Sequence, residues 1–294
     1  MDTLLQLIVS GVLLGGVYAL LALGVVVIFK ATKIFNFAVG SLAMLGAYLL
    51  WSFCVALQLP LWVSIILVVL ATWIIGVVLY QATVRPMVGQ PLMSIVIMTL
   101  GMSILLDALV LAFWGSQQKY YVQFLPTGGI QLGTVVISDQ YLIAFVVALL
   151  FFGALTLFFR YTNIGLAMRA VAENHDAARA SGIKVGNIFM WTWVIATLTA
   201  AVGGILLGSI RGLDLSLSSV GLKAFPAILL GGLESFPGCI IGGFIIGIAE
   251  NLGSGYLDTF TQGGMSDVMP WILAVLILVT MPHGLFGEKR IERI

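Results

Sequence analysis

The sequence of 294 residues has few charged side chains. Charged residues make up 9% of the chain, whereas hydrophobic residues make up 61%, and the mean hydropathy is +1.15. Globular domains carry about 25% charged residues, so this composition excludes an ordinary water-soluble domain and indicates an integral membrane protein. The net charge of +1 leaves no basic surface for nucleic acid, and no nucleic-acid partner is expected.

The chain also lacks the residue clusters on which metal, nucleotide and catalytic sites are built. Its two cysteines, Cys54 and Cys239, lie in separate apolar segments, which argues against a disulfide framework and a thiolate metal site. The two histidines, His175 and His283, have no paired ligand and are expected to be solvated. No HExxH or GxxxxGK(S/T) motif occurs, so we expect no metal, no cofactor and no enzymatic activity. Any ATP must be hydrolysed by another subunit.

What the sequence does contain is a series of apolar runs of about 20 residues, the length that a helix needs to cross a bilayer. Backbone groups in lipid must be hydrogen-bonded within the protein, so each run is expected to be a helix. We therefore predict an all-α polytopic membrane helix bundle that forms a single transmembrane domain, residues 1–294. The eight expected spans are 4–29, 36–57, 60–83, 91–114, 140–159, 187–209, 238–256 and 268–286. The first run is too long for the apolar part of a signal peptide and is expected to be retained.

The positions of lysine and arginine predict the orientation of the bundle. If the first span runs inward, ten of the thirteen basic residues lie on the cytoplasmic side, as the positive-inside rule requires. These ten are Lys30, Lys33, Arg85, Arg160, Arg169, Arg179, Lys184, Lys289, Arg290 and Arg293. The N-terminus is thus expected outside and the C-terminus in the cytoplasm.

This topology requires one more inward segment between the sixth and seventh spans. Residues 223–232 supply only about 15 Å of helix at 1.5 Å per residue, too little to cross. We expect a re-entrant or broken helix. Irregular backbone at membrane depth needs protein or water around it, so residues 221–237 are expected to line the interior or a pathway. The alternative is a short, tilted span completed by residues 213–220.

Spaced glycines predict close helix packing. The pairs Gly11/Gly15, Gly204/Gly208 and Gly243/Gly247 each place two small residues on one helix face. Small residues let two helix backbones approach each other. Together the three pairs favour a compact bundle.

The external loop, residues 115–139, contains a Pro-Thr-Gly-Gly turn signal at 126–129 between two β-prone runs. This pattern predicts a hairpin or an extended flap. Such a loop could help to dock an external solute-binding protein, or it could be a structured connector.

Ionisable side chains inside the spans are candidates for a pathway, because they are costly in hydrocarbon and usually face a bundle interior or an aqueous cavity. Asp107 lies within the fourth span, one turn after Ser103, and Glu250 lies within the seventh span. Either carboxylate could instead be a hydrogen-bonded structural group. Asn36 opens the second span and could serve as a helix N-cap. The candidate translocation pathway comprises Asn36, Phe37, Asp107, Phe225 and Glu250.

The long charged interruption of the apolar chain is the cytoplasmic loop, residues 160–187. Residues 165–173 predict a short helix that residues 174–176 interrupt. Asp176 is expected to cap a second helical turn that extends as far as Arg179. Gly182 is expected to end that turn in a left-handed conformation. The helix pair would lie across the membrane face and meet a partner. The alternative is a connector between spans whose arginines enforce the topology.

Several runs of sequence resemble the permease subunits of branched-chain amino acid ABC transporters. GLAMRAVAENHDAARASGI, residues 165–183, resembles their cytoplasmic coupling loop. The likeness continues through KAFPAILLGGLESFPGCIIGGFIIGIAENL, Asn36-Phe37-Ala38, the Arg85-Pro86 turn, GMSILL and MPHGLFG. It covers essentially the whole chain. The combination of the coupling loop with the Gly-Gly-x-x-Ser-x-Pro-Gly turn at residues 231–238 is specific.

This resemblance implies the translocation subunit of a type II-like importer in the bacterial inner membrane. It implies as partners two ATP-binding subunits, a second homologous permease subunit and an external solute-binding protein, with membrane lipid around the bundle. It also implies that Glu173 and its neighbours transmit the stroke of the ATPase. The candidate coupling residues are Arg169, Glu173, Asp176, Arg179 and Gly182.

The chain departs from the family pattern in two regions. Members usually carry a histidine, a glycine and an acidic residue after Asn-Phe-Ala, where this chain has Val39, Gly40 and Ser41. Relatives often have an amide at the position of Asp107. The expected cargo is therefore a branched-chain amino acid or a related small solute such as urea, an amide or an aromatic acid. An alternative from another class is a self-contained channel or ion-coupled secondary transporter that uses Asp107 and Glu250.

Overall fold

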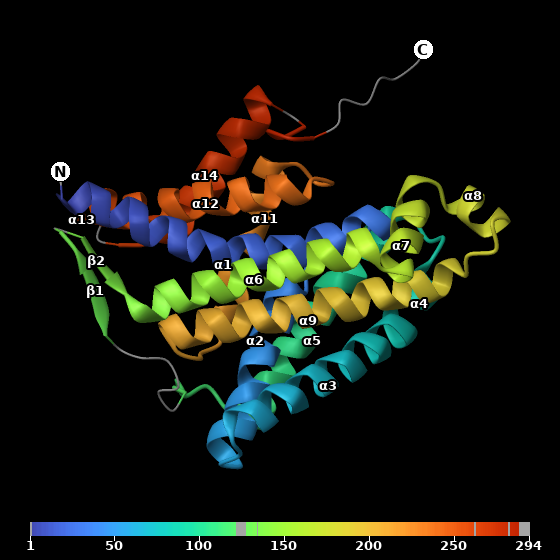
Figure 1. Cartoon of the computed structure of the whole chain (residues 1–294), viewed down its shortest axis with the longest axis horizontal. Coiled ribbons are helices and arrows are strands. Elements are labelled where there is room, and N and C mark those ends of the chain that lie inside the picture. Colours follow the sequence, from blue (N-terminus) through green and yellow to red (C-terminus); the bar gives the residue numbers. More distant parts are fainter. Residues whose placement is uncertain (1, 122–127, 134, 262, 282, 288–294) are drawn as a thin grey trace. The chain divides into compact units, whose positions relative to one another are not determined.

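The computed structural model describes residues 2–121, 128–133, 135–261, 263–281 and 283–287. Apart from one hairpin, the regular elements among these residues are helices, which confirms the predicted all-α class (Figure 1). In chain order the elements are α1 (Asp2–Thr32), α2 (Val39–Trp51), α3 (Leu61–Leu79), α4 (Arg85–Met87), α5 (Leu92–Trp114), β1 (Gly129–Leu132), β2 (Val135–Ser138), α6 (Asp139–Tyr161), α7 (Asn163–Glu173), α8 (His175–Ala180), α9 (Val185–Arg211), α10 (Ser216–Gly221), α11 (Ala224–Gly231), α12 (Phe236–Leu252), α13 (Asp258–Thr261) and α14 (Met265–Thr280).

Within the described part of the chain, seven helices are long and apolar enough to cross a membrane. They are Thr3–Thr32, Val39–Ala56, Leu61–Met87, Leu92–Trp114, Asp139–Tyr161, Val185–Arg211 and Phe236–Thr261, and they confirm a polytopic bundle. The eighth expected span, 268–286, is the 16-residue helix α14, which is shorter than a bilayer needs. It ends because Met281 leaves the helical conformation, at φ −136° and ψ 81°, as residues before a proline commonly do.

Backbone contacts group the chain into two compact units. Unit 1 comprises Met1–Val26, Leu125–Ala148 and Lys223–Ile294, and unit 2 comprises Val27–Phe124 and Leu149–Leu222. The long helices α1 and α6 each contribute residues to both units. The two units are described separately below.

In unit 2, helix α2 packs against α9, α5 and α10 (Figure 1). Its neighbours approach closely because glycines lie at the contacts. A Cβ atom added at Gly204 of α9 would overlap the carbonyl oxygen of Ala43, and one added at Gly40 would overlap that of Ser218. The predicted role of Gly204 in close packing is thus confirmed, and α2 is a central helix of this unit.

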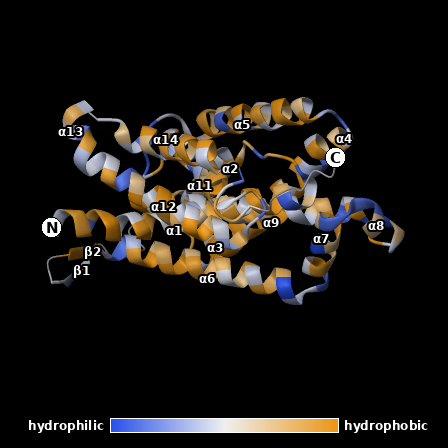
Figure 2. Cartoon of the chain, turned by 90° about the horizontal axis from the view of Figure 1, so that it is seen from above, coloured by the Kyte–Doolittle hydropathy of each residue, from blue (hydrophilic) through white to orange (hydrophobic). Residues whose placement is uncertain are grey.

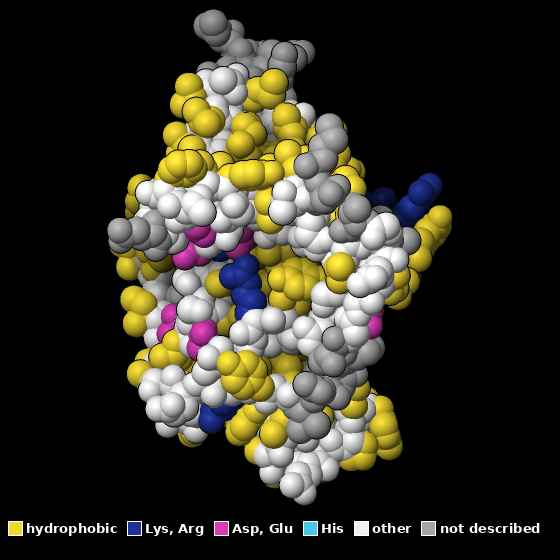
Figure 3. All heavy atoms as spheres, turned by 90° about the vertical axis from the view of Figure 1, so that its left-hand side faces the viewer, with side chains coloured by type: hydrophobic (Ala, Val, Ile, Leu, Met, Phe, Trp, Pro, Cys, Tyr) yellow, Lys and Arg dark blue, Asp and Glu magenta, His cyan; other side chains and the backbone are white. Residues whose placement is uncertain are grey.

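Helix α3 shows that the outer surface of unit 2 suits lipid. Its buried positions, Ser64, Val68, Thr72 and Gly76, recur every four residues and are small or polar. Its exposed side chains include Trp62, Ile66, Leu70 and Trp73. A helix that buries small residues and exposes large apolar ones is typical of a membrane bundle. Figure 2 shows the hydrophobic colouring along the long helices. Figure 3 shows a different face, on which apolar side chains lie among polar ones and a few acidic and basic ones.

In unit 1, two predicted glycine pairs face each other. A Cβ atom at Gly11 of α1 would lie 2.9 Å from the carbonyl oxygen of Gly247, and one at Gly15 would lie 2.5 Å from that of Gly243 on α12. These distances leave no room for side chains, which confirms that the pairs allow close helix packing. Helix α12 also contacts α11 and α14.

The external loop forms the predicted hairpin, but at a different place. Strands β1 and β2 pair antiparallel with Leu132 opposite Val135, so the connection lies at residues 133–134. The turn signal at 126–129 precedes the hairpin, since Gly129 already belongs to β1; Pro126 and Thr127 lie outside the described residues. The Gln6 side chain of α1 hydrogen-bonds both backbone groups of Val136, which ties the hairpin to unit 1.

The chain between α9 and α12 is a broken helix, as predicted. Helices α10 and α11 have six and eight residues, and Leu222 and Lys223 separate them. Eight residues give about 12 Å of helix, which is too short to cross a membrane. Most side chains of α11 are buried, in agreement with the expectation that this segment lies in an interior.

We expect Gly204→Ala to destabilise the protein by about 1–3 kcal/mol, because the added methyl group overlaps the backbone of α2. Gly101→Ala is the matched control, since no atom lies within 4 Å of its added Cβ. This control should leave stability unchanged or raise it by up to about 1 kcal/mol, because alanine favours helix. Thermal unfolding of the purified variants in detergent measures both effects. Equal melting temperatures would contradict the close packing of α2 on α9.

Candidate functional site

The cytoplasmic loop folds into two short helices, α7 and α8, and its caps differ partly from those predicted. Asn174, with extended backbone, caps α8: its Oδ1 accepts hydrogen bonds from the amides of Asp176 and Ala177 at 2.9 and 3.0 Å. The prediction that Asp176 caps this helix is wrong, because Asp176 already lies in the first helical turn. Gly182 has φ +82°, which confirms the predicted left-handed conformation after the helix.

The five candidate coupling residues all lie on the exposed side of this helix pair. They are Arg169, Glu173, Asp176, Arg179 and Gly182. The opposite side buries Met168, Val171 and Ala178, and both helices contact α9. The pair therefore offers charged side chains to a partner while its apolar side rests on a long helix; the charged stretch is evident in Figure 2.

His175 anchors α8 to the rest of unit 2. Its Nε2 lies 3.0 Å from the carbonyl oxygen of Ala31, near the end of α1. A carbonyl oxygen can only accept, so Nε2–H donates this hydrogen bond. Its ring meets Phe189 of α9 edge-on, with 5.5 Å between centroids. The expectation of a solvated His175 is wrong, because the side chain is half-buried. A sequence window around His175 could not show a partner 144 residues away.

A pocket of about 290 Å³ lies beside this anchor. His175 and Arg179 of α8 line it together with Lys33 and with Gly89 and Gln90 of the turn before α5. Helix α8 thus adjoins both the α1–α2 linker and the α4–α5 turn.

A polar cluster of three serines and one aspartate lies where α2, α5 and α10 meet in unit 2. The Ser41 hydroxyl is 2.8 Å from that of Ser103 and 3.0 Å from that of Ser218. Ser218 in turn donates to Oδ2 of Asp107 at 3.2 Å. The sequence paired Asp107 with Ser103, but the direct partner of its carboxylate is Ser218. No local pattern indicates Ser218, because it lies on a short helix 111 residues away.

Asn36 and Phe37 lie in the linker before α2. Asn36 is 1% exposed, and its Oδ1 accepts a hydrogen bond from the amide of Ala38 at 3.0 Å. This contact shapes an Asx-turn. Ala38 occupies the N-cap position of α2, so the suggestion that Asn36 is itself the N-cap is wrong. The Phe37 ring lies 6.4 Å from that of Phe35.

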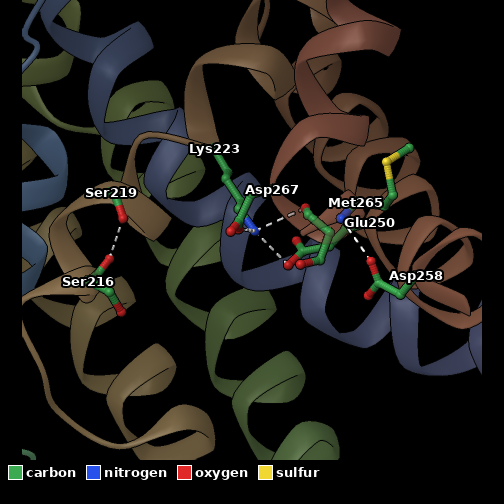
Figure 4. Close-up of polar contacts among 8 residues, drawn as sticks. Ser216, Ser219, Lys223, Glu250, Asp258, Met265 and Asp267 are labelled. Carbon is green, nitrogen blue, oxygen red and sulfur yellow. Dashed lines mark hydrogen bonds and ion pairs between the residues drawn. The ribbon is translucent and has the colours of Figure 1, made fainter. Parts of the chain in front are cut away.

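In unit 1, Lys223 brings two carboxylates together (Figure 4). Its Nζ is 2.8 Å from Oε1 of Glu250 on α12, 2.9 Å from Oδ1 of Asp267 on α14, and 3.2 Å from the Ser266 carbonyl oxygen. Lys223 and Glu250 are only 3% and 1% exposed, whereas the Asp267 side chain is 71% exposed. The sequence analysis did not predict this ion pair. A usable signal was present, because Lys223 lies at the predicted helix break and Glu250 lies within a span, and a buried carboxylate is often paired with a cation.

The candidate pathway residues are divided between the units. Asn36, Phe37 and Asp107 belong to unit 2, whereas Phe225, 5% exposed on α11, and Glu250 belong to unit 1. The structure gives Glu250 a cationic partner and gives Asp107 only a hydroxyl partner among the described residues. The two in-span carboxylates therefore have different environments.

Apolar helices that enclose polar clusters, together with a charged helix pair beside α9, are typical of a polytopic membrane protein with a functional interior. The family model for the permease component of branched-chain amino acid transport systems matches residues 7–281, and the chain belongs to this family. It is a multi-pass inner-membrane protein.

Individual relatives match over nearly their full lengths. The high-affinity branched-chain amino acid transport system permease protein LivH of Salmonella typhimurium is 33% identical, over 99% of this chain and 97% of its own. BraD of Pseudomonas aeruginosa is 32% identical, over 99% and 98%. Among solved structures, PsaBC from Streptococcus pneumoniae in complex with Fab covers 95% of this chain and 91% of its own, at 12% identity and a TM-score of 0.46.

We expect Lys223→Met to destabilise the protein by about 3–5 kcal/mol, because it leaves Glu250 buried without its cation. The double variant Lys223→Met/Glu250→Gln removes both charges and should recover most of that loss. Lys184→Met, at an exposed position, is the control and should change little. Thermal unfolding in detergent tests all three. A double variant no more stable than Lys223→Met would contradict the buried ion pair as the cause.

Proposed function

We propose that the protein is the translocation subunit of an ATP-driven ABC importer for branched-chain amino acids or a related small solute such as urea, an amide or an aromatic acid. The observation that carries this proposal is the α7–α8 helix pair. Its charged side is exposed, its apolar side rests on α9, and His175 connects it to the end of α1. Membership of the permease family supports the same function.

In this proposal ATP binding in partner subunits pushes on residues 163–182. Arg169, Glu173, Asp176 and Arg179 contact the ATPase, and Gly182 ends the helix pair before the chain enters α9. The contacts of α7 and α8 with α9, and of His175 with Ala31, carry the displacement into the bundle. A rigid connection of this kind is what a coupled movement of packed helices requires.

The partners in this proposal are two ATP-binding subunits, a second homologous permease subunit and an external solute-binding protein. ATP hydrolysis belongs to the ATP-binding subunits, because this sequence has no P-loop motif. The N-terminus is outside and the C-terminus is in the cytoplasm, in keeping with the positive-inside rule. The external loop, residues 115–139, with its hairpin β1–β2, faces the solute-binding protein.

The alternative function is a self-contained channel or ion-coupled secondary transporter with Asp107 and Glu250 as cation sites. The structure gives one observation against it: Glu250 is already paired with Lys223 at 2.8 Å, so its charge is compensated by the chain itself. The alternative predicts transport by the purified chain alone under an imposed ion gradient. The ABC proposal predicts none without ATP-binding subunits.

We expect variants of the helix pair to reduce uptake by the complete complex in proteoliposomes. Glu173→Ala removes an exposed contact and should lower binding-protein-stimulated ATP hydrolysis and uptake together. His175→Ala removes the hydrogen bond that anchors α8 to Ala31. If this loss lowers the coupling free energy by about 1.4 kcal/mol, uptake per ATP hydrolysed should fall by about tenfold.

Ser181→Ala is the matched control, because Ser181 is exposed at the end of α8 and its hydroxyl bonds only the preceding helical turn. It should behave as the unmodified complex. Normal stimulated hydrolysis and normal uptake in both the Glu173 and the His175 variants would exclude a coupling role for α7 and α8.

A further inference from the structure

Asp107 is a half-buried residue of α5 in unit 2, and its carboxylate is satisfied only in part by the described residues. Its Oδ2 accepts a hydrogen bond from Ser218 at 3.2 Å, whereas its Oδ1 is buried and has no hydrogen-bond partner among the described residues. No cation within the described part of the chain lies at ion-pair distance from it. A buried acceptor without a donor is unfavourable, and in a membrane bundle lipid supplies none. The described residues therefore leave Oδ1 of Asp107 able to accept a hydrogen bond from a donor outside the protein.

The serines beside Asp107 cannot supply that donor, because each hydroxyl has one proton and two lone pairs. Ser218 uses its proton on Asp107. In the 3.0 Å contact between Ser41 and Ser218, Ser41 must then be the donor, and in the 2.8 Å contact between Ser103 and Ser41, Ser103 must be the donor. The three protons form a chain directed toward the carboxylate, and all of them are used.

The cluster as a whole therefore offers only acceptors. Its free positions are Oδ1 of Asp107 and the remaining lone pairs of the serines. A ligand group with N–H bonds complements such a site, whereas a carboxylate is repelled by it. The cluster thus distinguishes the two ends of an amino acid.

The backbone around the cluster holds it in place. Added Cβ atoms at Gly40 of α2 and at Gly221 of α10 would meet the facing helix, so these two helices are in backbone contact. Ser218 lies on α10 and Ser41 on α2, so the hydroxyl chain links the two packed helices. A preorganised acceptor loses less free energy on binding than one that must be assembled.

We propose that Asp107, positioned by Ser218, Ser41 and Ser103, forms a cargo-binding site for an N–H donor group. The donor is either the ammonium group of an amino acid or the amide nitrogen of an uncharged solute, and Oδ1 of Asp107 accepts its hydrogen bond. Asp107 binds the cargo, and the three serines are positioning residues that fix its carboxylate. This inference deepens the proposed function and rests on it.

The test is ATP-driven uptake by the complete complex in proteoliposomes with three probes: leucine, which has an ammonium group; acetamide, which has an uncharged amide; and 4-methylpentanoate, which has a carboxylate but no N–H. The unmodified complex should import leucine, acetamide or both, and should not import 4-methylpentanoate. Asp107→Leu should lower uptake of each imported N–H probe by about tenfold or more, as expected for a lost charge-assisted hydrogen bond.

Asp107→Asn separates the two donor classes and is isosteric, so it decides the outcome if Asp107→Leu fails to assemble. For an ammonium site, leucine uptake falls by about tenfold, because the charge is lost. For an amide site, acetamide uptake is largely retained, because the amide oxygen of asparagine still accepts. The proposal is overturned if both Asp107→Asn and Asp107→Leu take up leucine and acetamide as fast as the unmodified complex does.

A matched pair on α10 controls for damage to the helix. Ser218→Ala removes the donor to Asp107 and should lower uptake of the imported N–H probe, whereas Ser219→Ala should not. Ser219 is exposed, and its hydroxyl bonds only the Ser216 carbonyl oxygen of its own helix, at 2.7 Å (Figure 4). Equal uptake in the two variants would overturn the positioning role.

Failure of the site and failure of the proposed function give different results. If the unmodified complex shows no ATP-driven uptake of leucine, acetamide, urea or an aromatic acid, the proposed function fails and the site proposal with it. If it imports them and imports 4-methylpentanoate equally well, only the N–H site is overturned. Uptake that an imposed pH gradient drives in the unmodified protein without ATP, and that Asp107→Asn abolishes, would assign Asp107 to proton transfer instead.

Discussion

The constraint on which this structure depends is that polar atoms inside a lipid-embedded bundle must find their partners within the protein, because hydrocarbon offers none. Lys223 satisfies it with Glu250 and Asp267, so helices α12 and α14 of unit 1 meet on the ammonium group of the residue before α11. Asp107 satisfies it only in part, through a chain of serine hydroxyls. The first arrangement pairs opposite charges inside the protein, whereas the described partner of the second carboxylate is a hydroxyl group.

Close backbone packing makes both arrangements possible. A hydroxyl has a short reach, so Ser41 and Ser218 can meet only because glycines let α10 lie against α2. In unit 1 the glycines of α1 and α12 bring two backbones together in the same manner. Small residues in this protein therefore bring buried polar side chains of neighbouring helices within hydrogen-bond distance.

Much of the fold was predictable because its signals are local. Hydropathy placed seven long helices, and glycine spacing indicated where backbones approach. Gly182 indicated the end of α8, because the residue after a helix often has a left-handed backbone conformation, which glycine adopts most readily. Local signals also misled: Asn174 caps α8 in place of Asp176, and the hairpin turn follows the Pro-Thr-Gly-Gly run. At α8, Asn174 rather than Asp176 has the extended backbone that a helix cap requires.

The sequence by itself determined the class of protein, the positions of most helices, the exposed helix pair of the cytoplasmic loop and the family resemblance. Only the tertiary structure decided which polar side chains meet. Lys223 and Glu250 are 27 residues apart, and Asp107 and Ser218 are 111 apart. Such pairs depend on the rotation and crossing of helices, and the periodicity of a single helix specifies neither.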